Sequence, residues 1–221
     1  MSSEASRGGD AGRRRGAYLV GRPSFLRDGV LSVVVYPVLK RVVDLGLGSV
    51  AAVMAAPVMV VIAVAVRRDS AGPALFRQQR VGRGGRPFFM YKFRSMTVDS
   101  PTFGPKPARM DDERVTRVGR FLRRTSLDEL PQLLNVLRGE MSLVGPRPEQ
   151  PFLVDRYAAW QRERLAVLPG MTGWWQVNGR KQPMHEHVEE DLYYVRHRCL
   201  ALDLRILART VGAVLGGKGA R

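Results

Sequence analysis

The stretch LGLGSVAAVMAAPVMVVIAVAV, residues 45–66, decides the fold, because it has no charged side chain and holds Pro57 near its centre. A straight helix of this length would measure about 33 Å, enough for a bilayer core of about 30 Å. Basic pairs flank it on both sides, however, at Lys40–Arg41 and Arg67–Arg68. A single crossing would place one pair on the wrong side of the positive-inside rule.

Pro57 indicates how both basic pairs can stay on one side of a membrane. A proline removes a helical hydrogen bond and clashes with the preceding turn, so the sequence predicts a bend there, in a helix-break-helix arrangement. Each arm is then about 15–18 Å long and reaches only to about the middle of the bilayer. We therefore expect a re-entrant helix within residues 30–68 that enters and leaves by one face. A simple transmembrane anchor and a buried core helix are the alternatives.

The composition indicates a negatively charged partner. The chain of 221 residues carries 36 Lys and Arg against 20 Asp and Glu, a formal net charge of +16. Nucleic acid, anionic lipid and phosphorylated substrates all fit this charge. The apolar stretch favours membrane lipid and argues against nucleic acid. A single cysteine, Cys199, excludes internal disulfides and thiolate metal clusters.

The pattern divides the chain into three regions: a disordered basic arm (1–29), the membrane helix region (30–68) and a catalytic domain (69–221) of α/β, helix-rich character. In the last region, the strand-like runs Leu75–Val81 and Pro87–Phe93 flank a glycine-rich turn and predict a small β-hairpin. A phosphate-binding loop is the alternative, but the Lys-Ser/Thr of a P-loop is missing.

A basic amphipathic pattern follows the hairpin. Val118, Phe121 and Leu122 recur at helical spacing, with arginines between and beside them. Such a helix suits a membrane interface, where apolar side chains enter the acyl boundary and arginines meet phosphates. A surface helix packed on the protein core is the alternative.

The stretch RRTSLDELPQ, residues 123–132, is the richest in chemistry. Its simplest interpretation is structural, because Ser126 and Glu129 match a capping box. A functional interpretation uses the same geometry: at a helix N-terminus Asp128 would stay ionised, as a carboxylate nucleophile requires, beside N–H groups that favour a phosphate. Glu129 would then face elsewhere and hold Mg²⁺, which binds through one or two carboxylates plus substrate phosphates.

Five basic side chains are candidates for binding phosphate. Arg123 and Arg124 precede the Asp-Glu pair and offer guanidinium groups to diphosphate oxygens. Lys92 and Arg94 alternate with large apolar residues and share one face of a strand. Arg147 stands between two prolines, which restrict its backbone. A solvated basic strand and a rigid turn are the alternatives for the last two motifs.

In this order the motifs resemble the bacterial sugar transferase family, the polyprenol-phosphate phosphoglycosyl transferases with one re-entrant membrane helix, in their short monotopic form. The resemblance covers residues 37–215. Ala56 departs from it, since a Ser usually precedes the membrane proline in the family. The matching stretches are KRVVD (40–44), GPALFRQQRVG (72–82), YKFRSM (91–96), RRTSLDELPQL (123–133), MSLVGPRPE (141–149) and PGMTGWWQVNGR (169–180).

The resemblance implies an enzyme at the cytoplasmic face of the bacterial inner membrane that initiates polysaccharide or glycoconjugate assembly. Asp128 would attack the β-phosphate of a UDP-sugar, release UMP and form an aspartyl phosphosugar. A polyprenol phosphate of the undecaprenyl type would then accept the sugar phosphate. Glu129 would be the carboxylate associated with Mg²⁺. The other implied site positions, as phosphate or nucleotide contacts or as a nearby acid, are Lys92, Arg123, Arg147 and Asp191.

A non-catalytic basic scaffold of a membrane-bound glycan assembly complex is the rival interpretation. It gives no reason for Asp128-Glu129 to stand between two arginines and Leu-Pro-Gln-Leu. The sequence leaves open the sugar, the glycan pathway, the polyprenol length and the role of the basic arm. It also leaves open the oligomeric state, for which a homo-oligomer is one option.

Overall fold

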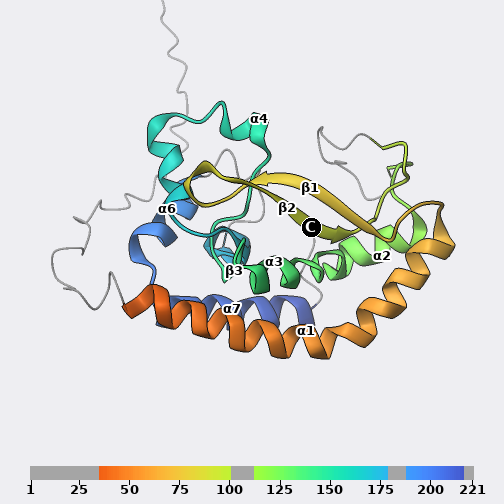
Figure 1. Cartoon of the computed structure of the whole chain (residues 1–221), viewed down its shortest axis with the longest axis horizontal. Helices are drawn as coiled ribbons and strands as arrows, with labels where there is room; N and C mark the ends of the chain where they lie inside the picture. Colours follow the sequence, from red (N-terminus) through yellow and green to blue (C-terminus); the bar gives the residue numbers. More distant parts are fainter. Residues whose placement is uncertain (1–34, 101–111, 179–187, 217–221) are drawn as a thin grey trace, which may run out of the picture.

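The structure is a computed structural model that describes residues 35–100, 112–178 and 188–216; the basic arm lies outside these ranges. The fold is helix-rich, with two small two-stranded sheets beside one long apolar helix, α1 (Tyr36–Asp69) (Figure 1). The other elements are β1 (Leu75–Val81), η3 (Arg83–Gly85), β2 (Pro87–Phe93), α2 (Arg117–Thr125), η4 (Leu127–Glu129), α3 (Gln132–Arg138), β3 (Ser142–Val144), α4 (Pro151–Val154), η5 (Ala159–Ala166), β4 (Gly170–Thr172), α5 (Trp174–Asn178), α6 (Val188–His197) and α7 (Leu200–Leu215).

Helix α1 is continuous over 34 residues and contains Pro57. The helix bends, as expected, and curves toward the rest of the protein (Figure 1), but the expected break between two helices is wrong, because α1 continues through the proline. A proline inside a helix is a recognised cause of such a bend, because it removes one hydrogen bond without ending the helix. The helix also begins earlier than the apolar stretch, so the basic Lys40–Arg41 pair belongs to its first turns.

Helix α1 is long and apolar enough to cross a membrane, yet only 11% of its most apolar window is buried. The interpretation as a buried core helix is therefore wrong. Both ends of the helix contact the same protein body. Near the first end, Lys40 Nζ lies 3.0 Å from Asp203 Oδ2 in α7, and at the other, Asp69 Oδ2 accepts a hydrogen bond from Val118 N in α2 at 2.9 Å.

The predicted β-hairpin is confirmed. Strands β1 and β2 pair antiparallel from Leu75 opposite Phe93 to Val81 opposite Pro87. The turn between them contains Gly84 and Gly85 with φ of 67° and 78°, a backbone conformation that glycine adopts without a steric penalty. The glycines therefore make the turn.

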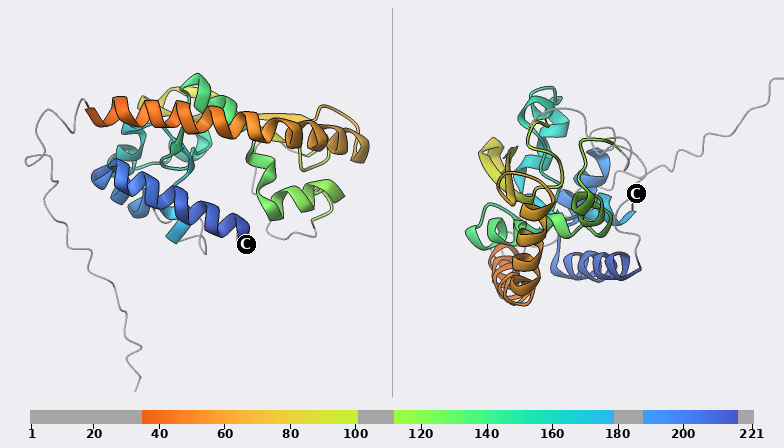
Figure 2. Two further views of the ribbon diagram at one scale, coloured as in Figure 1. Left: turned by 90° about the horizontal axis from the view of Figure 1, so that it is seen from below. Right: turned by 90° about the vertical axis from the view of Figure 1, so that its right-hand side faces the viewer.

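The main core lies where the hairpin, α3, β3, α6 and α7 meet. β3 and β4 pair in parallel, and β3 contributes buried side chains to this core. Figure 2 shows α1 and α7 along the same face of the molecule. Small side chains of α1 pack on the core from this face, which lets the long helix approach closely. The buried core residues are Phe88, Met90, Leu133, Val136, Met141, Leu143, Val144, Tyr194, Leu202 and Ile206.

Helix α2 connects the far end of α1 to the site. Its N-terminus is capped by Thr116, whose hydroxyl accepts a hydrogen bond from Gly119 N at 3.0 Å. Leu122 is buried against Ile62 and Val66 of α1, whereas Phe121 is half exposed. The helix thus packs on the core with one side, and its contact with a membrane interface stays a prediction.

Candidate active site

Asp128 and Glu129 lie in the short 3₁₀ turn η4, between α2 and α3. Ser126 ends α2 with a left-handed backbone, φ 59°, and its side chain makes no capping hydrogen bond. The capping-box interpretation is therefore wrong. The acidic pair does lie in the first turn of a helix, but this is the three-residue 3₁₀ helix η4, and α3 begins only at Gln132.

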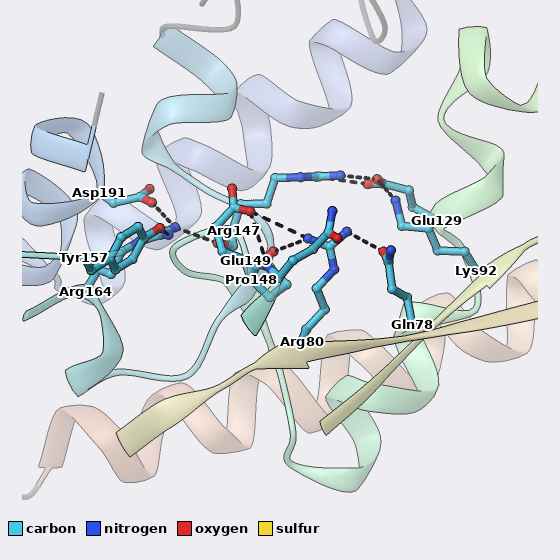
Figure 3. Close-up of polar contacts among 11 residues, drawn as sticks. Gln78, Arg80, Lys92, Glu129, Arg147, Pro148, Glu149, Tyr157, Arg164 and Asp191 are labelled. Atoms are coloured by element: carbon cyan, nitrogen blue, oxygen red, sulfur yellow. Dashed lines mark hydrogen bonds and ion pairs between the residues drawn. The ribbon is translucent and has the colours of Figure 1, made fainter. Parts of the chain in front are cut away.

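Glu129 is held between two cations from distant parts of the chain (Figure 3). Lys92 Nζ, near the end of β2, lies 2.7 Å from Glu129 Oε1, and Arg147 Nη2, in the loop after β3, lies 2.6 Å from the same oxygen. Burial alone would raise the pKa of Glu129. The charges of Arg147 and Lys92, with hydrogen bonds from both, outweigh burial and hold the pKa well below its usual range.

Asp128 is nearly buried, with 9% of its surface exposed. Burial is the main reason why its pKa is raised, and the charge of Glu129 raises it further. The charges of Lys92, Arg147 and Arg123 act in the opposite direction and favour the ionised carboxylate. Ionisation of Asp128 is thus favoured by these three cations and opposed by burial, rather than supported by the start of a helix.

Asp191 lies in α6 and is 1% exposed, so it is not at the surface of the site. Its Oδ2 accepts a hydrogen bond from Arg164 Nη2 at 2.5 Å, and Arg164 also donates to the carbonyl of Arg147 at 2.6 Å. The predicted acid near the site is therefore connected to Glu129 through Arg164 and Arg147, as Figure 3 shows.

Two predicted phosphate-binding arginines lie elsewhere. Arg94 is buried, and its guanidinium donates to Pro73 O at 2.8 Å, Ser70 Oγ at 2.7 Å and Ser70 O at 2.9 Å. It therefore closes the connection between α1 and β1. Arg124 is exposed on α2. Of the five basic candidates, the structure brings Lys92, Arg123 and Arg147 to the Asp-Glu pair.

The donor set at Glu129 is compatible with Mg²⁺. Among the described residues, no group of three or more His, Cys, Asp and Glu gathers to form a protein cage for a metal. Mg²⁺ does not need one, since it usually keeps several waters and takes one or two carboxylates plus substrate phosphates. Oε1 of Glu129 accepts from both cations, whereas Oε2 has only a 3.5 Å contact from Arg147 Nη1. Oε2 is therefore the Glu129 oxygen with the weaker contact, and the one that Mg²⁺ would approach if it binds here.

The sequence reasoning missed Asn135 in α3, which is fully buried beside the site. Its Oδ1 accepts from Tyr91 N at 3.1 Å, and its Nδ2 donates to Phe89 O at 2.7 Å. The residue thus fixes the β2 segment that carries Lys92. The sequence does contain an indication of this role, because Gln132 and Asn135 are polar residues, three positions apart, with leucines between them.

Comparison with known proteins identifies the family of the chain. The chain matches the family described as bacterial sugar transferase over residues 35–217. It is 41% identical over 194 residues to a protein of Aeromonas hydrophila named UDP-N-acetylgalactosamine-undecaprenyl-phosphate N-acetylgalactosaminephosphotransferase, with 85% of this chain and 46% of the relative covered. It is 47% identical over 178 residues to a UDP-glucose:undecaprenyl-phosphate glucose-1-phosphate transferase of Xanthomonas campestris pv. campestris, with 74% of this chain and 36% of the relative covered.

A relative of the same name from Caulobacter vibrioides is 42% identical over 196 residues, which cover 85% of this chain and 73% of that protein. The chain spans less than half the length of the Aeromonas and Xanthomonas relatives. The family match nevertheless includes every element from α1 to α7 and all residues of the Asp-Glu site. The chain belongs to the bacterial sugar transferase family.

Proposed function

We propose that the chain transfers a sugar-1-phosphate from a UDP-sugar to a polyprenol phosphate of the undecaprenyl type. The observation that carries this proposal is the nearly buried Asp128 beside Glu129, within the influence of three cations from three different segments. The names of the relatives give the substrate classes, UDP-sugar and undecaprenyl phosphate, and here these are carried over as a proposal.

The reaction has two displacements at one phosphorus atom. The Asp128 carboxylate attacks the β-phosphorus of the UDP-sugar, and the bond from that phosphorus to the bridging oxygen breaks, so that UMP leaves with the oxygen. A phosphate oxygen of the polyprenol phosphate then attacks the aspartyl phosphosugar. The carboxylate leaves in its ionised form, and polyprenol diphosphate-sugar is the product.

The basic residues stabilise the negative charge that comes together in both displacements. Asp128 and its substrate are both negatively charged, so their approach needs fixed positive charge in a site with little water. Lys92, Arg123 and Arg147 supply that charge from β2, α2 and the loop after β3. We infer that Glu129 would hold Mg²⁺ together with the substrate diphosphate. The ion would supply charge neutralisation for the diphosphate and for the UMP that leaves.

We propose that α1 is re-entrant and that the site lies at the cytoplasmic face of the inner membrane. Two contacts support this: Lys40 with Asp203, and Asp69 with Val118 N. A helix whose two flanks contact one body cannot place them on opposite sides of a bilayer unless that body also crosses it. The convex side of α1 faces away from the body (Figure 1), so its bend would enter the lipid. A water-soluble nucleotide and a lipid phosphate could then meet at the same depth.

UMP release tests the proposed function directly. The full chain in detergent or nanodiscs is incubated with undecaprenyl phosphate, Mg²⁺ and a panel of UDP-sugars, and UMP is measured. We expect release with at least one sugar, and none from Asp128→Asn. Asp155→Asn, which changes an exposed aspartate beside α4, is the matched control and should keep full activity. No UMP from any sugar would favour the scaffold interpretation.

Trapping tests the covalent step separately. With the lipid acceptor withheld, radiolabelled UDP-sugar should leave label on the wild-type protein and on Asp155→Asn, but not on Asp128→Asn. Turnover with acceptor but no trapped label would point to direct transfer instead.

A further inference from the structure

The loop Pro146–Glu149, which carries Arg147, is held through its carbonyl oxygens. Two of its four residues are prolines and have no N–H to donate, so other segments can fix this backbone mainly through the carbonyls. All four carbonyls accept a hydrogen bond from outside the loop. The bonds are Gly170 N to Pro146 O at 2.8 Å, Arg164 Nη2 to Arg147 O at 2.6 Å, Arg80 Nη1 to Pro148 O at 3.1 Å, and Val81 N to Glu149 O at 3.0 Å.

The two middle donors are buried arginines. Arg164 is 2% exposed and Arg80 is 6% exposed. Burying a guanidinium is costly, and a neutral amide would satisfy a carbonyl with less desolvation. A guanidinium, however, offers several donors in a rigid plane, so that one group can hold several acceptors in a fixed arrangement.

The two terminal nitrogens of Arg164 use this capacity and hold three acceptors. Besides the carbonyl of Arg147, it donates to Tyr157 OH at 2.5 Å and to Asp191 Oδ2 at 2.5 Å. The buried pair with Asp191 joins η5 to α6 and fixes the plane of the guanidinium. In Figure 3, Arg164 holds the backbone end of Arg147, while the side chain of Arg147 extends to Glu129 at the other end.

Arg80 holds the carbonyl of Pro148, the residue after Arg147. It comes from β1, donates to Gln78 Oε1 at 2.6 Å and lies 3.8 Å from Glu149 Oε2. Its bond to Pro148 O therefore ties the loop to the hairpin whose second strand carries Lys92. Both cations that hold Glu129 thus connect to the same hairpin.

We propose that Arg164 and Arg80 are positioning residues of the transferase site, which hold the carbonyls of Arg147 and Pro148 and so direct the Arg147 guanidinium at Glu129. This inference rests on the proposed function. It also gives Asp191 a different role from a substrate contact, because Asp191 orients Arg164 and acts on the site only through it.

A purely structural role predicts something different. If Arg164 only stabilised the fold, its substitution would reduce activity by the same factor whether or not Arg147 were present. If it acts through Arg147, its effect should largely vanish once the Arg147 guanidinium has been removed. A double-mutant cycle separates these cases.

The cycle compares four full-length proteins in nanodiscs: wild type, Arg164→Lys, Arg147→Met and the double variant. Lysine keeps a cation opposite Asp191 but cannot reach three acceptors in one plane. We expect Arg164→Lys to lower kcat for UMP release by about tenfold with KM changed less than about twofold, and to change kcat by less than about twofold in the Arg147→Met background. Arg196→Lys, which alters the exposed ion pair with Glu163, is the matched control and should leave kcat unchanged.

Equal losses in both backgrounds would overturn the proposal. If Arg164→Lys does not fold, as judged by thermal unfolding, Arg80→Lys takes its place in the same cycle with the same expectation.

A second readout does not depend on turnover. UDP should raise the unfolding temperature of the wild type, and Arg164→Lys should make this rise smaller. In the Arg147→Met background, adding Arg164→Lys should not reduce the rise any further. A wild type that is stabilised by UDP but releases no UMP would overturn the proposed function, while the same four proteins, compared by their UDP-dependent shifts in unfolding temperature, would still test the positioning role. A wild type with neither property overturns both.

Discussion

The carboxylate of Asp44, in the apolar helix α1, accepts a hydrogen bond from the backbone N–H of Leu143 in β3 at 3.1 Å. Asp44 is buried, and Arg41 one turn before it donates to Val136 O at 2.7 Å and Leu137 O at 3.0 Å at the end of α3. These polar contacts fix α1 at one position along the body, which apolar contacts alone would not do. β3 leads directly into the loop that carries Arg147, so α1 and the site are both fixed to β3.

Asp44→Leu should destabilise the protein by about 1–3 kcal/mol, because the buried N–H of Leu143 loses its acceptor. Asp44→Asn should retain most of the stability, since an amide oxygen can accept the same bond. Chemical unfolding in detergent measures both. Equal stability of Asp44→Leu and wild type would show that the contact does not hold α1.

Asp128→Asn should abolish transfer and leave the protein at least as stable as the wild type at neutral pH. Burial raises the pKa of Asp128, so the native state binds the proton more tightly than the unfolded chain does. Above the folded-state pKa the ionised carboxylate therefore costs folding free energy, and that cost disappears below the unfolded-state value of about 3.9. The stability difference between variant and wild type should accordingly shrink as pH falls. A variant that is less stable than wild type at pH 7 would contradict this account.

Lys92→Met should reduce kcat by about a hundredfold or more, the usual effect of removing one preorganised donor from a transition state. Its stability should change little, because the Lys92–Glu129 pair is partly exposed and Arg147 still pairs with Glu129. UMP release and thermal unfolding, measured on the same preparation, distinguish the two effects.

Arg94→Met should behave in the opposite way, although Arg94 stands only two residues further along the chain. Its hydrogen bonds to Ser70 and Pro73 close the connection after α1, so we expect a loss of about 2–3 kcal/mol in unfolding free energy. The KM for UDP-sugar in the folded fraction should be unchanged. A raised KM with unaltered stability would instead indicate that Arg94 contacts the substrate.

The re-entrant path predicts that both flanks of α1 are labelled from one side of a sealed vesicle. Single cysteines at exposed positions, Val38→Cys and Arg68→Cys, are introduced in a Cys199→Ser background. A membrane-impermeant maleimide should react with both from the cytoplasmic side. Met54→Cys, 74% exposed in the isolated protein, is the control and should be protected by lipid. Labelling of the two flanks from opposite sides would establish a transmembrane helix.

Short-range features were the most predictable from the sequence. The hairpin Leu75–Val81 and Pro87–Phe93 was predicted with its observed bounds, because strand alternation and a glycine turn depend on neighbouring residues. The Asp128-Glu129 pair was found for a similar reason, as an unusual local combination. At Pro57 the bend was predicted correctly, but the break was wrong, because a proline can bend a helix without ending it.

Side chains whose role depends on a distant partner were less predictable. Lys92 and Arg94 have the same charge and stand on the same predicted strand face, yet Lys92 reaches Glu129 while Arg94 turns back to Ser70. Arg164 carried no local signal at all, because its three acceptors come from other parts of the chain.

By itself, the sequence determined that the chain has one long apolar helix flanked by basic pairs, a small hairpin and an acidic pair among arginines, because these depend on composition and local spacing. Only the tertiary structure decided which cations surround the acidic pair, that burial opposes the charge of Asp128, and that both flanks of the apolar helix contact one body. Those properties arise from groups that are separated along the chain, by 37 residues for Lys92 and Glu129 and by 163 for Lys40 and Asp203. Distance in space, rather than position in sequence, sets the strength of an electrostatic contact.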